Sequence, residues 1–253
     1  MDNISPIVDS IVAFADTLNS TDGDVSSNFT EFLACVSPIV KWNITYLLSS
    51  FTSKKSLIKE EYIRLGISYN TAVEGINKKM QAGYAIRTDG VLGERITSKS
   101  HVILEAALRA TIEDTEYEKS VCYGRFMANV PFAKEYSSSA LTLLGNIIRQ
   151  VSYKELCLIA FCYEHQVINA ELLYKYIKEN DDIDASEIFS YLIHLKNIGV
   201  YITEGPFKPG SLIGNFRLTY IGNALYEILE LNLIGEDELF NIAKLMKKVG
   251  LFN

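Results

Sequence analysis

The chain has 253 residues, of which 48% are hydrophobic and 22% are charged, and its formal net charge is −7. This balance is ample for a packed core and excludes an intrinsically disordered chain. No apolar run approaches the roughly 20 residues needed to span a bilayer, and Met1 to Pro6 lacks the basic stretch that begins a secretory signal. We therefore expect one large or two modest globular domains in the cytoplasm.

The distribution of charge and the positions of the cysteines bear on the compartment and on the kinds of site the protein can have. Residues 54–109 hold ten bases and six acids, whereas residues 152–234 hold six bases and eleven acids. The cysteines lie within apolar runs and lack C-x-x-C spacing: Cys35, Cys122, Cys157 and Cys162. This arrangement predicts buried free thiols in a reducing compartment rather than a metal or redox motif.

The first half of the chain is predicted to be mainly helical, because apolar residues recur there at helical spacing. A helix at 101–110 is expected to turn Val102 and Leu104 inward, and a helix ending at Gln81 is expected to begin at Ser68 or Asn70. The other expected helices cover residues 3–18, 29–51, 56–66, 116–129 and 137–151.

Residues 152–197 carry start signals for three helices. Ser152 and Glu155 form an S-x-x-E capping box, in which each side chain can bond the other residue's backbone amide. A second helix is expected over 170–179. Asp184, with Glu187 three residues on, is predicted to cap the third.

After Gly199, which should end the third helix, the pattern becomes that of strands. Residues 200–203 and 216–219 are expected to form a hairpin around the Gly- and Pro-rich stretch 204–215. Thr219 should cap a closing helix in which Gly222 permits close packing. This order of elements is the winged helix-turn-helix plan.

The predicted fold class is therefore mainly α, with a helical domain over residues 1–151 and a winged helix-turn-helix-like domain over 152–253. The second domain contains a short β-hairpin and ends in an amphipathic helix at 237–249. Residues 83–98 could form a second, degenerate winged helix or a plain loop between helices. We favour the loop because the candidate strands there are very short.

Several short motifs resemble a group of uncharacterised bacterial proteins that have a helical region followed by a winged-helix-like C-terminus. The motifs are Arg87-Thr88-Asp89-Gly90, Glu105-Ala106-Ala107-Leu108, Glu118-Lys119, Gly124-Arg125-Phe126-Met127-Ala128-Asn129 and Val151-Ser152-Tyr153-Lys154-Glu155-Leu156-Cys157-Leu158. More distantly, the layout is similar to the Abi-alpha group, which is named for abortive phage infection. The resemblance spans residues 85–230 and implies a fold and a phage-defence role, but no catalytic residues. Lys154-Glu155 departs from the Arg-Gln of the group's pattern.

No catalytic, cofactor or metal motif is predicted. His101, His165 and His194 are far apart and none has metal-ligand spacing with a Cys or a carboxylate. The chain has no H-E-x-x-H, G-x-S-x-G or Walker A sequence. We therefore expect a protein that is not an enzyme and binds no cofactor.

Nucleic acid is the natural partner of a winged helix, and its phosphates are contacted by Lys and Arg. The candidate contacts come from the basic middle segment and from the third helix and hairpin of the C-terminal domain. They are Lys78, Lys79, Arg87, Arg95, Ser190, His194, Lys196, Asn197, Lys208 and Arg217. The acidic C-terminal domain opposes this function, so DNA binding would need a homodimer and help from the basic segment.

The function we favour is a protein-interaction or sensing module that binds a protein partner or a second copy of itself. Its expected surface is formed by apolar residues around the hairpin: Ile202, Phe207, Leu212, Ile213 and Phe216. A DNA-binding transcriptional regulator is the alternative. The two hypotheses differ in their dependence on salt, because phosphate contacts weaken steeply as salt rises.

Overall fold

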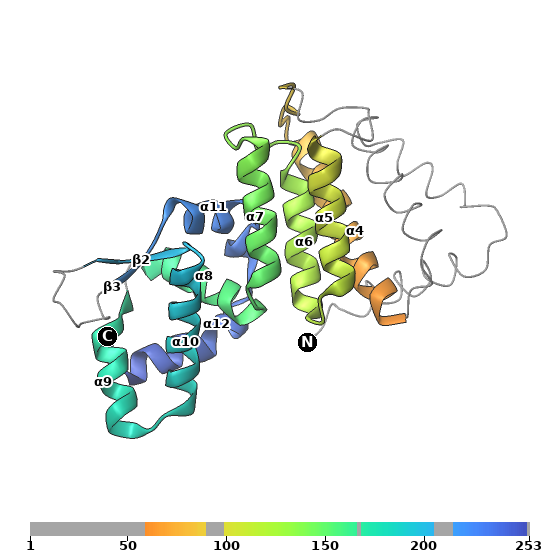
Figure 1. Cartoon of the computed structure of the whole chain (residues 1–253). Helices are drawn as coiled ribbons and strands as arrows, with labels where there is room; N and C mark the ends of the chain where they lie inside the picture. Colours follow the sequence, from red (N-terminus) through yellow and green to blue (C-terminus); the bar gives the residue numbers. More distant parts are fainter. Residues whose placement is uncertain (1–58, 90–98, 166–167, 205–214, 252–253) are drawn as a thin grey trace. The chain divides into compact units, whose positions relative to one another are not determined.

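The computed structural model describes residues 59–89, 99–165, 168–204 and 215–251. The protein is mainly helical with a small three-stranded antiparallel sheet, which confirms the predicted mainly α class (Figure 1). It divides into an N-terminal unit, Met1–Arg149, and a C-terminal unit, Gln150–Asn253. The helices expected at 3–18 and 29–51 lie outside the described residues, and so does Cys35.

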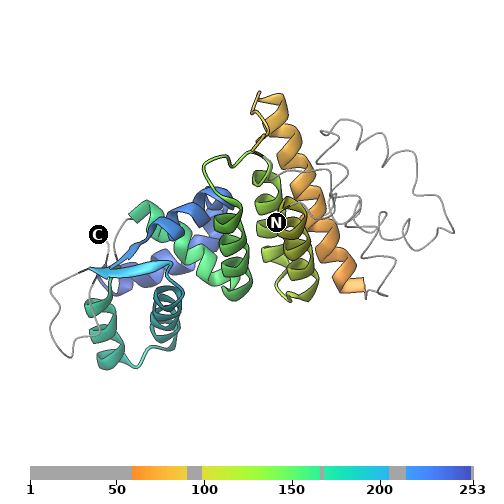
Figure 2. The same cartoon turned by 45° about the horizontal axis from the view of Figure 1, so that its top comes forward.

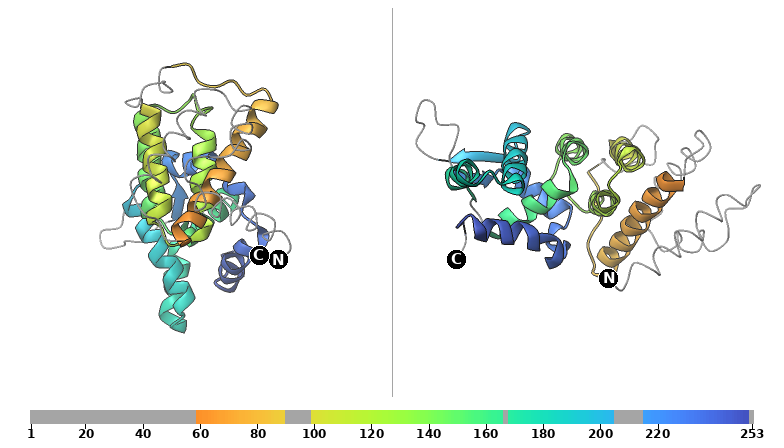
Figure 3. Two further views of the ribbon diagram at one scale, coloured as in Figure 1. Left: turned by 90° about the vertical axis from the view of Figure 1, so that its right-hand side faces the viewer. Right: turned by 90° about the horizontal axis from the view of Figure 1, so that it is seen from below.

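The N-terminal unit contains α4 (Lys59–Gln81), α5 (Lys99–Glu113), α6 (Tyr117–Asn129) and α7 (Ser138–Gln150). Helices α4, α5 and α6 contact one another in pairs. Seen from below, α5 and α6 are nearly end-on and α4 is inclined to them (Figure 3).

The expected break between residues 66 and 68 is wrong, because α4 runs without interruption for 23 residues. Ser68, which we expected to begin a new helix, is buried and accepts a hydrogen bond from the Thr111 hydroxyl at 3.3 Å. Leu65, Ala72 and Ile76 lie on the buried stripe of this single helix. Tertiary packing on α5 and α6 therefore overrides the local capping signal.

Two glycines allow α4 and α6 to approach very closely. A Cβ atom at Gly124 would lie 2.5 Å from the Ser68 carbonyl oxygen and 2.5 Å from the Thr71 Cβ, and one at Gly75 would lie 2.7 Å from the Ala128 Cβ. No side chain larger than hydrogen fits at Gly124 without moving the α4 backbone. The crossing of these two helices thus depends on the absence of a side chain.

Buried charges join α4 to the corner between α5 and α6. The Arg64 guanidinium donates to the Thr111 and Ile112 carbonyl oxygens at 3.3 and 2.8 Å, satisfying carbonyls at the end of α5 that have no helical partner. Next to them, Lys119 is paired with Asp114, which also accepts from the Tyr123 hydroxyl. Burial and the nearby Asp114 charge raise the pKa of Tyr123 above its usual range.

The C-terminal unit begins with α8 (Tyr153–His165) and β1 (Ile168–Asn169), followed by α9 (Ala170–Asn180) and α10 (Ile183–Asn197). Next come β2 (Tyr201–Glu204), β3 (Asn215–Leu218), α11 (Tyr220–Ile228), a 3₁₀ turn (Leu231–Leu233) and α12 (Glu236–Lys248). Helices α9 and α10 lie side by side (Figure 2). The strand β1 was not predicted, since two residues are too few to show an alternating pattern.

The sheet has the order β1-β3-β2, so β3 is its central strand. Phe216 of β3 lies opposite Ile168 of β1 and Thr203 of β2, and it packs edge-on against Tyr201 with ring centroids 6.2 Å apart. The Tyr201 hydroxyl donates to the Leu158 carbonyl oxygen at 3.2 Å, which ties the sheet to α8. Tyr201 and Phe216, which lie in the two strands of the expected hairpin, therefore contribute to the core of this unit.

Most of the predicted helix boundaries in the C-terminal unit are confirmed. The Ser152 amide donates to the Glu155 carboxylate at 2.7 Å and the Glu155 amide donates to the Ser152 hydroxyl at 3.2 Å, as the capping box requires. Gly199 has a φ of +82° directly after α10. Thr219 accepts from the Gly222 amide at the start of α11, and a Cβ at Gly222 would lie 2.7 Å from the Val200 carbonyl oxygen.

The cap of α10 was predicted wrongly. Asp182, not Asp184, accepts from the Ala185 amide, at 3.0 Å. The preceding Asp181 adopts a left-handed conformation with φ of 50° and ends α9, which places Asp182 in the extended conformation that a cap requires. Glu187 is accordingly free of any capping role and bonds to Tyr191 and Lys154 instead.

Within the described residues the cysteines Cys122, Cys157 and Cys162 are buried free thiols, as predicted. Burial raises the pKa of Cys162 to about 12. In the part of the chain that the structure describes, no helix is long and apolar enough to cross a membrane.

Candidate interaction surface

A cluster of polar side chains joins α8 to α10 in the C-terminal unit. The Glu155 side chain is buried, and its second carboxylate oxygen lies 2.6 Å from Nδ1 of His194 in the last turn of α10. On the solvent side the Lys154 ammonium donates to the Glu187 carboxylate at 3.0 Å. The Tyr191 hydroxyl and Lys154 hold the pKa of Glu187 below its usual range. These contacts fix the orientation of α10 on α8.

A second cluster fixes the other end of α10. Lys248, at the end of α12, donates to the Asp182 carboxylate at 2.7 Å, and the Tyr176 hydroxyl of α9 donates to the same oxygen at 3.3 Å. The hydrogen bond from Lys248 and that from the Ala185 amide hold the pKa of Asp182 below its usual range. The Asp182 bond raises the pKa of Lys248. Asp182 therefore connects α9, α10 and α12.

Asp182→Ala should lower the melting temperature at pH 7 by a few degrees, because it removes the cap of α10 and the partner of Lys248. A lowered folded-state pKa means that this stabilisation is present above the unfolded-state pKa of about 4 and is lost as the pH falls below it. The difference between the variant and the parent should thus shrink by pH 3. Asp184→Ala is the matched control, since Asp184 is exposed on the same helical turn. An equal effect of the two variants would contradict the assignment of the cap.

The residues proposed to contact nucleic acid fall into both units. Lys78 and Lys79 lie in the last turn of α4, and the Lys79 ammonium is 5.3 Å from the centre of the Tyr84 ring. On α10, Ser190 and Asn197 are exposed and Lys196 is half-buried. Of the three remaining candidates, Arg217 is exposed on β3, whereas Arg95 and Lys208 lie outside the described residues.

The structure corrects the assignment of Arg87 as a phosphate contact. The residue is 3% exposed, and its guanidinium donates to the Ala133 and Tyr136 carbonyl oxygens, each at 2.9 Å. It also forms a two-pronged ion pair with Asp89, at 3.0 and 2.6 Å. Arg87 thus holds the segment after α4 against the turn that precedes α7. Its charge is used within the fold and does not face solvent.

Two of the five residues expected on the partner surface around the hairpin, Ile202 and Phe216, lie in the described part of the chain. Ile202 is 42% exposed on β2, in agreement with its proposed position on the surface. Phe216 is 1% exposed, so its place on a partner surface is wrong: it belongs to the central strand and fills the core. Phe207, Leu212 and Ile213 lie outside the described residues.

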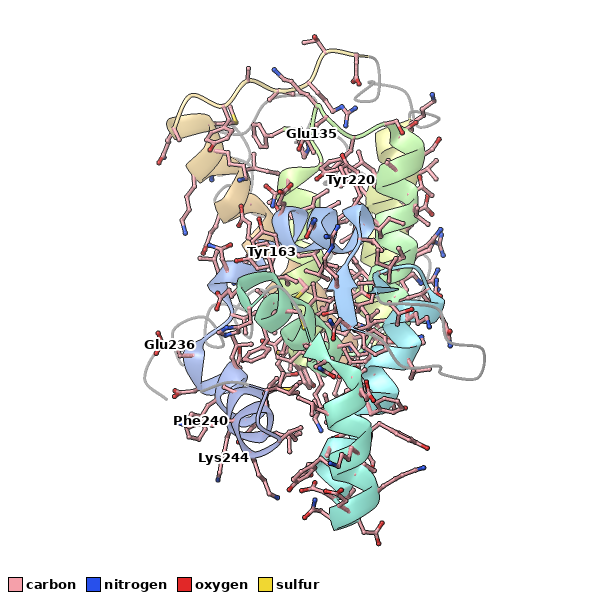
Figure 4. All side chains as sticks on the ribbon, turned by 90° about the vertical axis from the view of Figure 1, so that its left-hand side faces the viewer. Glu135, Tyr163, Tyr220, Glu236, Phe240 and Lys244 are labelled. Atoms are coloured by element: carbon pink, nitrogen blue, oxygen red, sulfur yellow. The ribbon has the colours of Figure 1, made fainter. Side chains whose placement is uncertain are left out.

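Sequence reasoning missed a pair of tyrosines on α8 and α11 with a neighbouring carboxylate, which we call the tyrosine surface: Tyr163, Tyr226 and Glu164. The rings of Tyr163 and Tyr226 are stacked face to face, with centroids 3.6 Å apart and planes inclined by 6°. Tyr163 is 38% exposed and Tyr220 is 73% exposed. Both are labelled on the same side of the C-terminal unit in Figure 4.

The tyrosine surface carries negative charge. Burial, and then the charge of Glu164, raise the pKa of Tyr226. Glu164 is itself exposed at the end of α8. Tyr163 and Tyr226 are 63 positions apart in the sequence, and no local pattern indicates that their rings stack in the fold. A partly exposed aromatic pair beside a carboxylate is suited to bind a cation.

Comparisons of the chain with protein-family models, with curated proteins and with solved structures found no match. Among the described residues, no group of three or more His, Cys, Asp and Glu side chains is placed to hold a metal ion.

Proposed function

We propose that this chain is a non-enzymatic protein-interaction module of the cytoplasm, built on a winged helix-turn-helix in its C-terminal unit. The winged helix-turn-helix is supported by the order of elements, α8, β1, α9, α10, β2 and β3. It is also supported by the antiparallel sheet with β3 at its centre. In that plan α10 is the helix that would enter a DNA groove. The side chains around α10 therefore bear on the choice between protein and DNA.

The charges around α10 favour a protein partner. Phosphate contacts need unpaired cations, but Lys154 and Lys248 each lie against a carboxylate, at 3.0 and 2.7 Å. The ring nitrogen of His194 is likewise bound to Glu155. Asp184 adds an exposed acid in the first turn of α10. A polyanion would meet carboxylates on this face.

The tyrosine surface is the observation that carries the proposal. Tyrosine is enriched at protein interfaces, because it offers a large contact area and a polar hydroxyl at a low entropic cost. The stacked Tyr163 and Tyr226 rings beside the Glu164 carboxylate would bind an Arg or Lys side chain through both cation–π and ionic contacts. We propose that the partner is a protein segment bearing such basic side chains.

The experiment measures fluorescence anisotropy of a labelled nona-arginine peptide titrated with the full chain. Glu164→Lys should weaken binding by about tenfold, since it replaces an attraction by a repulsion at the site. Glu171→Lys is the matched control, because it makes the same change of charge at an exposed position in the first turn of α9. Tyr163→Ala should weaken binding without any change of charge. Equal weakening by the two lysine variants would mean only non-specific attraction to an acidic protein and would overturn the proposal.

The alternative function, DNA binding, is favoured by one observation. Ser190 and Asn197 are exposed on α10 at a spacing that places them on one face of the helix that would enter a DNA groove. Titration of random duplex DNA at about 50 and 200 mM salt separates the two functions. Micromolar binding that collapses at the higher salt would favour a transcriptional regulator. The phage-defence role implied by the family resemblance stays a prediction.

A further inference from the structure

Helix α12 packs one face against the rest of the C-terminal unit and exposes the opposite face to solvent. Ile242 and Met246 are buried on the inner face, and the Tyr153 hydroxyl of α8 donates to the Glu238 carboxylate at 2.7 Å. The Lys248 bond to Asp182 fixes the far end of the helix. α12 is therefore held firmly in place, so its outer face is a rigid surface.

The outer face carries a stripe of three residues, Glu236, Phe240 and Lys244, at positions i, i+4 and i+8. All three are exposed, and Phe240 is 62% exposed. Figure 4 shows them following one another along the helix. An acid at the start of a helix and a base at its end complement the helix dipole. That effect accounts for Glu236, but neither for Lys244, which precedes the last turn, nor for a large aromatic ring exposed between them.

The two charges of the stripe cannot neutralise each other within one helix. Eight residues at a rise of 1.5 Å separate them by roughly 12 Å. In contrast, two other charges at the ends of α12 are used internally: Glu238 accepts from Tyr153 and from the Gly235 amide, and Lys248 pairs with Asp182. The stripe thus presents one acid, one ring and one base to a partner.

We propose that α12 pairs with a second copy of itself, antiparallel, about a two-fold axis that passes near Phe240. In this arrangement Phe240 contacts Phe240 of the partner subunit, and Glu236 lies opposite Lys244 of the partner subunit. Because the two-fold axis makes the interface self-complementary, the second ion pair forms by symmetry. A parallel pairing would instead place Glu236 against Glu236 of the partner subunit, so the charges select the antiparallel orientation.

The size of the surface sets the expected strength. Stable interfaces bury about 1,200–2,000 Å² in total, and a single pair of four-turn helices falls below that range. We therefore expect a weak, concentration-dependent dimer rather than an obligate one. The inference concerns a surface separate from the tyrosine surface and does not depend on the proposed function.

The experiment is sedimentation velocity of the full chain over a range of concentrations, with a charge swap across the axis. Glu236→Lys and Lys244→Glu should each weaken the dimer by about tenfold or more, since each places like charges opposite one another twice. The double variant Glu236→Lys with Lys244→Glu should restore the dimer, because the pairs are re-formed with their signs exchanged. Phe240→Asp should abolish it.

Two controls separate this interface from general effects. Glu171→Lys changes the net charge as Glu236→Lys does and should leave dimerisation unchanged. The far-ultraviolet circular dichroism of each variant should match that of the parent, because all the changed residues are exposed. A parent chain that stays monomeric at all concentrations, or a double variant no better than the two single ones, would overturn the proposal. Peptide binding by the Phe240→Asp variant should be unchanged, which distinguishes failure here from failure of the proposed function.

Discussion

Gly124→Ala should destabilise the N-terminal unit by about 2 kcal/mol or more, although alanine is the better helix former. The added Cβ would lie 2.5 Å from the Ser68 carbonyl oxygen, a backbone atom that cannot rotate away. Helix α4 would have to move off α6, exposing apolar side chains such as Ala72 and Ala128 that are now buried. Guanidinium unfolding followed by circular dichroism would measure the loss.

Gly145→Ala is the control for this prediction. It makes the same change in the neighbouring helix α7, but its Cβ would lie 3.5 Å from the Phe126 ring, which is an ordinary contact. This variant should be as stable as the parent or more stable by up to about 1 kcal/mol. Equal stability of the Gly124→Ala and Gly145→Ala variants would show that α4 and α6 are not as close as described.

The close crossing of α4 and α6 also explains why the sequence misled us about α4. Ser68 and Asn70 favour helix starts, and Gly66 favours a helix end. All three nevertheless lie within one helix, because burial against α5 and α6 contributes more than a local cap. Leu104 of α5 is buried as predicted, but Val102 was misjudged for a related reason. Val102 is 56% exposed whereas Ile103 is 3% exposed, and a run of apolar residues does not show which of them points inward.

Prediction succeeded where a boundary depends on neighbouring residues alone. The Ser152–Glu155 box, the left-handed Gly199 and the Thr219 cap are each local arrangements, and each is present. The cap of α10 is the instructive exception, since Asp182 and Asp184 are chemically equal candidates. The backbone of Asp181 decides between them, and no sequence pattern specifies that conformation.

Side-chain roles that depend on distant residues could not be predicted. Arg87 looks like a surface cation in sequence, yet it is buried because the 131–136 turn supplies two carbonyl acceptors. The tyrosine surface arises only when α8 and α11 are packed together. The sequence specifies the charge and type of each residue, whereas its exposure depends on the fold.

Glu155→Ala should destabilise the C-terminal unit by about 3 kcal/mol, the second large effect we expect. The carboxylate is 3% exposed and accepts three hydrogen bonds, from the Ser152 amide, the Ser152 hydroxyl and His194. Its removal leaves the amide at the start of α8 and the ring of His194 without their acceptor. The loss would be measured by guanidinium unfolding.

Lys154→Ala is the matched comparison, because it removes the other link between α8 and α10. The side chains of Lys154 and Glu187 are 65% and 40% exposed, respectively. Their ion pair should therefore contribute less than about 1 kcal/mol to stability. Similar losses of stability for Glu155→Ala and Lys154→Ala would mean that burial does not strengthen the contact between Glu155 and His194.

A double-mutant cycle between Glu155 and His194 then tests the role of the histidine. If His194 serves to orient α10, the cycle should give a coupling of about 1–2 kcal/mol, and His194→Ala should cost stability by itself. If His194 instead contacts DNA, His194→Ala should leave stability unchanged and weaken DNA binding. The 2.6 Å contact with a buried carboxylate favours the first outcome. Because Nδ1 of His194 is bound to that carboxylate, only Nε2 could contact a base. The effects of His194→Ala on stability and on DNA binding therefore separate the two roles.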